Sequence, residues 1–381
     1  MKIPQIPTVK TISHFTPSLY EAALRCKALA IWSAFGDRNA LPQSSNAILG
    51  SCFHKVLELA NKGQFPQDKK ACYDAARQVF EEQVRSQYQN AHSLLKSKFR
   101  SIDRLPYYYL FRERAAVHAV DIALQKQPST SPGISKPSGG AEVSLVSRDG
   151  LIKGRPDYIN VAESEVIDYK SGTKAEVVGT ELSGSEIRQL RLYAHLCLEN
   201  DIQISKGSIV RGNNQYATLT IADEDARKEG DAARVLLAEL NAAAARQTFK
   251  EMAEPSSENC KGCSCIPLCE AFWEQATPEW ANECGLHLEA EVIEPPSPSI
   301  NSASKVITLE TNAIRGTFSP AQVTIQQIPE NWLMLDGENI PKVGDTVRLI
   351  DAKPTNSDAS SVVGIDKFST SIWIVTESRS L

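Results

Sequence analysis

The order of strand and helix patterns between residues 141 and 246 constrains the fold most. Residues 141–147 and 151–161 are strand-like, and Asp149-Gly150 between them favours a tight hairpin turn. The other elements predicted in this stretch are strands at 165–170, 208–211 and 217–221, a helix opening at the Ser183-x-x-Glu186 capping box, and a helix at 223–246. This alternation predicts an α/β unit.

The segment before this stretch is predicted to be helical. Thr16-Pro17 has the form of a helix start, and that helix is predicted to run through about Trp32. Further helices are predicted from about Gly50 to Leu59 and over most of 69–126. Residues 128–140 are rich in Pro, Ser and Gly and are predicted to form a loop.

The segment after this stretch has a different character. Residues 291–304 are rich in Pro and Ser and predict a linker, and residues 305–381 show short strand-like runs with few helical signals. A chain of 381 residues is long enough for two or three compact units. We therefore expect an α/β domain at 13–290 and a small β-rich domain, an OB-like or SH3-like barrel, at 305–381.

Composition bears on the location of the protein, its surface charge and the use of its cysteines. No run of 18 uncharged apolar residues occurs, and the N-terminal residues lack the apolar core of a secretory signal, so a cytoplasmic protein is expected. The net charge of -5 argues against a surface that is basic throughout, although it leaves room for a local basic groove. Nine cysteines without a secretory signal favour a metal or cluster site over disulfides.

Asp168-Tyr169-Lys170 is the sharpest chemical signal. Side chains alternate along a strand, so Asp168 and Lys170 are predicted to share one face, and Asp157 ends the preceding strand nearby. Two carboxylates can hold Mg²⁺ or Mn²⁺, and an ammonium group beside them can orient and polarise the attacking water. These parts suit phosphodiester hydrolysis, but an isolated Asp-x-Lys pair is more often a solvated surface pair.

Other residues complete a motif series. The chain contains, in order, Gly50-x3-His54, Gly154-x2-Asp157, Asp168-x-Lys170 and Gln189-x3-Tyr193. Over residues 13–275 this series resembles the RecB-like exonucleases of the PD-(D/E)XK superfamily. The resemblance implies a restriction-endonuclease-like core, with a mixed central sheet flanked by helices.

The resemblance also implies roles for these residues. His54, Asp157 and Asp168 would bind the metal ion, and Lys170 would activate water. Gln189 and Tyr193, which share a helical face, would support the site or the DNA backbone. Glu142 is also placed where related proteins have an acidic residue, and a plain surface glutamate on a hairpin is an equal alternative.

A second site is predicted from cysteine spacing. Cys260, Cys263 and Cys269 form C-x2-C-x5-C, and Cys26 lies far earlier in the chain. Four thiolates hold either Zn²⁺ or a [4Fe-4S] cluster, and spacing does not decide between them. The arrangement resembles the CRISPR adaptation nucleases and the AddB subunit of helicase-nucleases, which favours a structural iron-sulfur staple. Cys265 could replace Cys263 or Cys269, and Cys52, Cys72, Cys197 and Cys284 are expected to be buried thiols.

Candidate DNA contacts lie between residues 96 and 114. The same stretch holds the cations Lys96, Lys98, Arg100 and Arg104 and several aromatic residues, as in sites where cations contact phosphates and rings stack on unpaired bases. The alternative is an amphipathic helix that buries its aromatics. The chain has no phosphate-binding G-x4-G-K-[ST] loop, so any helicase motor must come from a partner.

These expectations combine into one functional hypothesis. The acidic residues predict Mg²⁺- or Mn²⁺-dependent hydrolysis of phosphodiester bonds. The resemblance implies a deoxyribonuclease, an exonuclease acting on single-stranded ends or flaps in DNA repair, CRISPR adaptation or phage defence. The runner-up is a non-catalytic DNA-binding or assembly subunit of a helicase-nuclease or defence complex. A zinc-dependent adaptor is a third possibility, which would require the acidic series to be coincidental.

Overall fold

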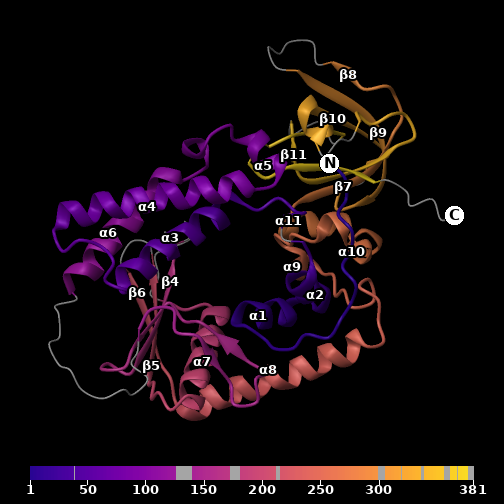
Figure 1. Ribbon diagram of the computed structural model, residues 1–381. Coiled ribbons are helices and arrows are strands. Elements are labelled where there is room, and N and C mark those ends of the chain that lie inside the picture. The colour runs from indigo at the N-terminus through magenta and orange to yellow at the C-terminus, as the bar shows by residue number, and fades with distance from the viewer. Residues whose placement is uncertain are drawn as a thin grey trace.

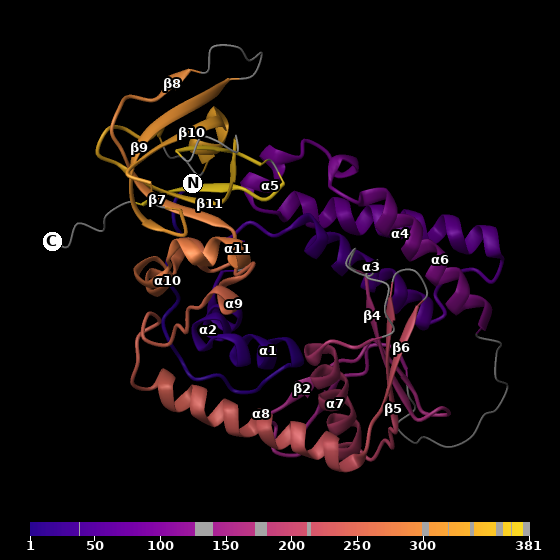
Figure 2. The same cartoon turned by 180° about the vertical axis from the view of Figure 1, so that it is seen from behind.

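The elements follow a ring-like path through the molecule (Figure 1). The computed structural model describes residues 1–37, 39–125, 140–171, 181–211, 215–298, 305–318, 320–335, 339–355, 361–366 and 368–375. A helical layer and a small sheet lie on one side, the C-terminal strands lie on the other, and α8 connects the two sides. The view from behind shows the same path (Figure 2). None of the helices among the described residues is long and apolar enough to cross a membrane.

The N-terminal part is helical, as predicted, but it divides differently. Its helices are α1 (Pro17–Arg25), α2 (Lys27–Phe35), α3 (Ser45–Asn61), α4 (Lys69–Asn90), α5 (Ser93–Lys98) and α6 (Tyr108–Gln125). The single helix predicted from Thr16 to Trp32 is wrong, because Cys26 has extended backbone angles, φ -166° and ψ 125°, and separates α1 from α2. Helix α3 begins earlier than predicted, because the Ser44 side chain caps it at Ala47 N.

A mixed four-stranded sheet forms the centre of the α/β part. Its strands are β3 (Tyr158–Asn160), β4 (Glu165–Lys170), β5 (Lys206–Arg211) and β6 (Tyr216–Thr220), in that order. Strands β4 and β5 are parallel and the other pairs are antiparallel. The predicted strand at 165–170 is confirmed, and the predicted hairpin appears as two short strands, β1 (Leu145–Val146) and β2 (Lys153–Gly154).

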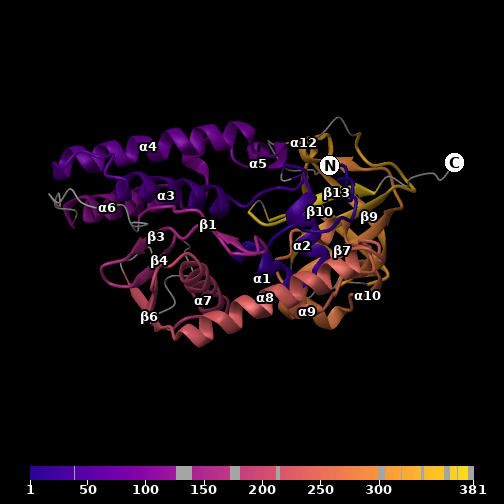
Figure 3. The same ribbon diagram turned by 60° about the horizontal axis from the view of Figure 1, so that its bottom comes forward.

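Helices cover both faces of this sheet. On one face, Val166 and Ile209 share a core with Leu190 of α7 (Gly184–Glu199), whose predicted capping box is confirmed. On the other face, Tyr169 and Val210 belong to a second core that contains residues of α3, α4 and α6. Helix α8 (Asp223–Ala244) packs on α7 and extends towards the cysteine-rich segment (Figure 3). The predicted mixed sheet flanked by helices is confirmed.

The C-terminal strands close into a barrel-like sheet. They are β7 (Leu286–Val292), β8 (Ser297–Pro298), β9 (Val306–Gly316), β10 (Gln322–Pro329), β11 (Thr346–Pro354), β12 (Val362–Gly364) and β13 (Ser371–Val375), and α12 (Glu330–Leu333) follows β10. The pairings β7–β9, β9–β10, β10–β12, β12–β11 and β11–β7 form a closed circuit. The predicted β-rich barrel is therefore present.

This barrel is joined to the rest of the chain more closely than a linker suggests. Its first strand, β7, begins at Leu286, before the boundary expected at 305, and β8 lies in the expected linker and pairs with β9. At the other end of the chain, Met1 is fully buried and its carbonyl accepts a bond from Ile374 N at 2.7 Å. The predicted loop at 128–140 lies outside the described residues except for Gly140.

Short elements connect α8 to the barrel and carry most of the predicted cluster ligands. They are α9 (Ser257–Cys260), a 3-10 turn at Ile266–Leu268, α10 (Glu270–Gln275), a 3-10 turn at Pro278–Trp280, and α11 (Ala281–Cys284). We call the stretch from Cys260 to Trp273 the cysteine segment.

Candidate functional site

Strand β4 carries the centre of the acidic site. Asp168 is 4% exposed, whereas Tyr169 faces the second core on the opposite side of the sheet, so the predicted alternation of faces is present. Lys170 Nζ lies 2.7 Å from Asp168 Oδ2. The predicted pairing of these two side chains on one face is therefore observed.

Gln189 of α7 connects these two groups. Its Nε2 donates to Asp168 Oδ1 at 2.7 Å, and its Oε1 accepts from Lys170 Nζ at 2.8 Å. Tyr193, one turn further along α7, is in weaker contact, with its hydroxyl oxygen 3.4 Å from Gln189 Nε2. Asp168, Lys170 and Gln189 thus form a closed set of contacts, which holds the ammonium group in one place.

Asp157 connects the sheet to α3. Its Oδ2 accepts from Tyr169 N at 2.7 Å, and its Oδ1 lies 3.2 Å from His54 Nδ1. His54 therefore reaches the site from the helical layer, although it lies more than a hundred residues before Asp157. The structure brings together all of the residues that the motif series predicted.

The two motif glycines have a packing role. A Cβ on Gly50 would lie 2.9 Å from Ser171 Oγ, so the missing side chain lets α3 approach the end of β4. A Cβ on Gly154 would lie 2.6 Å from Leu196 Cδ1 and 3.1 Å from Tyr193 Cε1. Each glycine thus allows a helix that carries site residues to pack closely.

The two carboxylates of the acidic site repel each other and also interact with Lys170 and His54. Burial raises the pKa of Asp168, and the charge of Asp157 raises it further while Lys170 opposes the shift. Burial disfavours the charged form of His54, but the hydrogen bond and charge of Asp157 outweigh burial, and the pKa of His54 is raised. A divalent cation would relieve the repulsion between the two carboxylates.

The donor atoms suit such a cation. Carboxylate oxygens are ordinary ligands of Mg²⁺ and Mn²⁺, whereas an imidazole nitrogen is a ligand of transition-metal ions rather than of Mg²⁺. Within the described part of the chain, no group of three or more His, Cys, Asp or Glu side chains is close enough to hold a metal ion as placed. For His54, Asp157 and Asp168 to bind one cation together, these side chains would have to move closer to one another than they lie here.

Glu142 lies at the border of the acidic site. Its backbone N–H donates to Asp157 O at 3.2 Å, and its side chain is ion-paired with Arg155. It has a left-handed φ of 55°. Burial and, to a smaller extent, Asp157 raise the pKa of Glu142. Arg155 was not singled out from the sequence, because an arginine next to a proline carries no distinctive signal.

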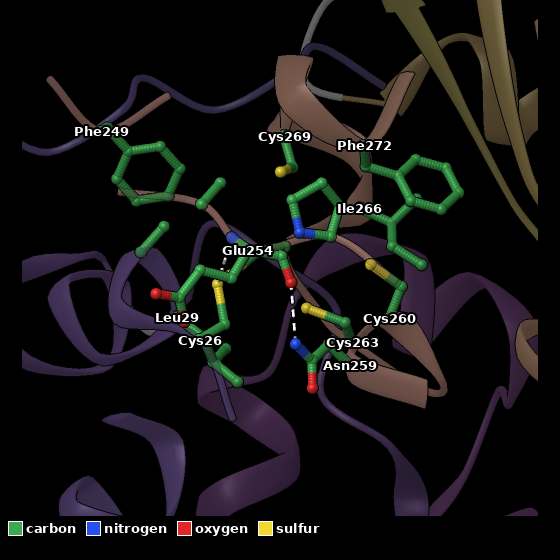
Figure 4. Close-up of a pocket in the computed structure, with 14 residues that line it drawn as sticks. Cys26, Leu29, Phe249, Glu254, Asn259, Cys260, Cys263, Ile266, Cys269 and Phe272 are labelled. Carbon is green, nitrogen blue, oxygen red and sulfur yellow. Dashed lines mark hydrogen bonds between the residues drawn. The ribbon is translucent and has the colours of Figure 1, made fainter. Parts of the chain in front are cut away.

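The predicted cluster ligands surround one pocket (Figure 4). Cys26 lies at the break between α1 and α2, and Cys260, Cys263 and Cys269 come from the cysteine segment. Cys265 lines the same pocket, so five cysteines adjoin it. Cys52, Cys72, Cys197 and Cys284 are buried and do not line this pocket, as expected for thiols that pack as small hydrophobic groups, although Cys284 lies near Cys260.

Arg25 links the end of α1 to the chain around Cys260. Its Nε donates to Asn259 O and its Nη2 to Lys261 O, each at 2.5 Å, directly beside Cys26 and Cys260. The sequence analysis missed Arg25, because it resembles an ordinary basic residue in the last turn of a helix. Burial raises the pKa of Cys260 to about 12 and of Cys269 to about 11, so these thiols are protonated unless a metal ion binds them.

The predicted DNA-contact segment divides into buried and exposed residues. Phe99, Tyr108 and Phe111 are buried, as the amphipathic alternative expects, whereas Tyr107 and Tyr109 are 54% and 55% exposed. Lys98 Nζ donates to Thr370 O of the barrel at 2.6 Å, so a DNA contact by this residue would compete with that bond. The exposed cations of the predicted set are Lys96, Arg100 and Arg104.

Comparison with known families is consistent with this geometry. A model of the PD-(D/E)XK nuclease superfamily matches residues 14–270, which is more than half of the chain and contains the whole acidic site. A search of curated proteins found no match. On the strength of the matched length and the assembled acidic site, the chain belongs to the PD-(D/E)XK nuclease superfamily.

Proposed function

We propose that this nuclease is a Mg²⁺- or Mn²⁺-dependent deoxyribonuclease of the RecB-like branch, acting as an exonuclease on single-stranded ends or flaps. The observation that carries the proposal is the closed set of contacts among Asp168, Lys170 and Gln189 beside Asp157 and His54. A buried carboxylate and an immobilised ammonium group at this position are the parts that phosphodiester hydrolysis needs.

Each residue has a role in the proposed mechanism. His54, Asp157 and Asp168 would hold the divalent cation, which supplies Lewis-acid polarisation of the phosphate when bound. Lys170 orients the attacking water and stabilises the charge that develops on the phosphate oxygens. Gln189 fixes the position of the Lys170 ammonium group through its Oε1, and Tyr193 supports Gln189 from the next turn of α7.

Cleavage of end-labelled DNA by matched variants tests this mechanism. Lys170→Ala is expected to abolish cleavage of single-stranded substrate with either metal. Lys206→Ala is the control, because Lys206 also pairs with a β4 carboxylate, Glu165, at 3.0 Å, at the other end of the strand. Equal loss in both variants would contradict the assignment. Intact protein that binds DNA but never cuts it would favour the non-catalytic assembly subunit.

The preference for single strands rests on the exposed part of the residue 96–114 segment. Tyr107 and Tyr109 offer exposed rings, and Arg100 and Arg104 are exposed cations nearby in the sequence. Rings stack on unpaired bases of any sequence, and cations contact phosphates. Arg100→Glu with Arg104→Glu should weaken binding and reduce the salt slope by roughly 0.7 per lost contact to single strands. An unchanged salt slope would remove these residues from the DNA path.

We further propose that Cys26, Cys260, Cys263 and Cys269 hold a [4Fe-4S] cluster. Four thiols on one pocket have the donor chemistry for this cluster, and equally for Zn²⁺. The family resemblance supports iron. Anaerobic purification should give a brown protein with stoichiometric iron and sulfide. A colourless protein with stoichiometric zinc would replace the cluster by a zinc staple.

A further inference from the structure

A row of charged side chains crosses the barrel. In the strand register, Arg348 of β11 is opposite Glu289 of β7, and Glu289 is opposite Arg315 of β9. Arg348 Nε donates to Glu289 Oε2 and Arg315 Nε donates to Glu289 Oε1, each at 2.5 Å. Arg348 is 2% exposed and Glu289 is 3% exposed, so this row is not a solvated face of the barrel.

The row is directed at the cysteine segment. Arg348 Nη1 donates to Pro267 O at 2.7 Å, and its Nη2 donates to Glu270 Oε1. Arg315 Nη2 donates to Glu270 Oε2 at 2.8 Å. The Arg348 guanidinium also lies over the Trp273 ring, 5.0 Å from its centroid. The barrel therefore contacts this segment through a backbone hydrogen bond, ion pairs and a cation–π contact.

Cys269 lies between these contacts. Pro267 is two residues before it and Glu270 directly follows it, so one guanidinium group holds the chain on both sides of this thiol. A guanidinium group is planar, and its donors point in fixed directions. Arg348 is buried and donates to both Pro267 and Glu270, so it fixes the position of Cys269 between them. General hydrophobic packing would not fix this position as closely.

We propose that Arg348 is a positioning residue through which the barrel holds Cys269 in the cysteine pocket. The barrel then supports this pocket. Neither the nuclease fold nor the proposed [4Fe-4S] cluster assigns this role to the barrel. The inference concerns the placement of the thiol, so it does not depend on whether iron or zinc binds there.

Site-resolved thiol labelling of the full-length protein, as purified under anaerobic conditions, tests the inference. Arg348→Met should raise the alkylation rate of Cys269 by about tenfold or more, because local opening becomes easier, and leave the buried Cys52 and Cys197 unchanged. Arg234→Met is the matched control. Arg234 also bridges two carboxylates, Asp149 at 2.5 Å and Glu199 at 2.7 Å, but it does so between α8 and the β1–β2 hairpin and α7.

A second variant guards against general misfolding. Glu270→Gln removes the charge on the cysteine side and leaves Arg348, Glu289 and Arg315 paired within the barrel. It should also raise Cys269 labelling selectively, together with hydrogen exchange in residues 265–273, and Arg348→Lys should not restore protection. Unchanged Cys269 labelling in both Arg348→Met and Glu270→Gln would overturn the proposal. So would an equal rise at Cys52 and Cys197 in both variants.

Discussion

The acidic site and the cysteine pocket are assembled in different ways. At the acidic site, Asp168, Lys170 and Gln189 contact one another directly, and all three come from one strand and the helix that packs on it. At the cysteine pocket, the thiols line a common space, but no three of the described ones are close enough to bind a metal ion as placed. The supports of that pocket, Arg25 and Arg348, come from distant parts of the chain.

This difference indicates how each site should fail. Asp168, Lys170 and Gln189 of the acidic site are held by direct contacts within β4 and between β4 and α7, so altering them should remove chemistry and leave the fold intact. The cysteine pocket joins segments that are distant in sequence, so altering it should lower the stability of the fold. Molecules that remain folded should still cleave DNA. The predictions below separate these two outcomes.

The largest expected effect is the loss of cleavage in Asp168→Asn. Removing this carboxylate takes away a proposed metal ligand, and single-turnover cleavage should fall by a factor of about 10³ or more. Glu165→Gln is the matched control, because Glu165 is on the same strand, is 7% exposed and also pairs with a lysine. Thermal melting should show both variants folded. A similar loss of cleavage in both would mean that β4 tolerates no substitution.

Cys26→Ser tests the role of the cysteine pocket in stability. Loss of this proposed ligand should release the α1–α2 break from the cysteine segment and lower the free energy of unfolding by on the order of 3 kcal/mol, as for loss of a cross-link between distant segments. Metal content and denaturant unfolding measure this effect, with Cys72→Ser as the control at a buried thiol away from the pocket. Cleavage per folded molecule should persist. Full stability with no bound metal would contradict the staple.

Gly154→Ala should damage the acidic site through packing alone. The new methyl group would meet Leu196 at 2.6 Å and Tyr193 at 3.1 Å, so α7 must shift and carry Gln189 with it. A small displacement of positioning groups lowers the cleavage rate by roughly 10- to 100-fold. Gly140→Ala is the control, because its methyl group would be 3.8 Å from Val143 Cγ2, an ordinary contact. Equal rates in the two variants would show that the close approach at Gly154 is unimportant.

The smallest expected effect concerns Lys98, one of the residues through which the helical layer contacts the barrel. Burial lowers the pKa of Lys98 to about 8, against an ordinary value of 10.5. Below pH 8 the lysine is charged in both folded and unfolded states, so the folded protein carries the full cost of burying the charge. As pH rises from 8 towards 10.5 the folded state loses its proton first, and stability rises.

Comparison with Lys98→Met isolates this contribution. Between pH 8 and 10.5 the wild type should gain on the order of 1–2 kcal/mol relative to the variant, after allowing for partial solvent screening. Denaturant unfolding at several pH values measures the difference. Parallel profiles would show that Lys98 is solvated and that the Thr370 contact does not form in solution.

Local patterns predicted which residues of β4 and α7 lie together, for physical reasons. Strand alternation placed Asp168 and Lys170 together, and the Ser183 capping box marked the start of the helix that carries Gln189. Each of these signals depends only on neighbours in sequence. Their convergence with His54 came from family resemblance, because the pairing of α3 with Asp157 is long-range.

The cysteine side could be predicted only in part. Spacing indicated which thiols belong together, but a helix pattern through Cys26 concealed the break between α1 and α2. The row formed by Arg348, Glu289 and Arg315 was also missed, because charged residues on β7, β9 and β11 resemble an ordinary solvated strand face. That face is buried against the cysteine segment, which only the folded arrangement reveals.

Cleavage of end-labelled single-stranded DNA across a titration of Mg²⁺ or Mn²⁺, beside a sample with excess chelator, tests the central claim most directly. The account predicts shortening from the ends that requires the divalent metal and is absent in Asp168→Asn. Cleavage that continues with the chelator, or that persists undiminished in Asp168→Asn, would contradict it.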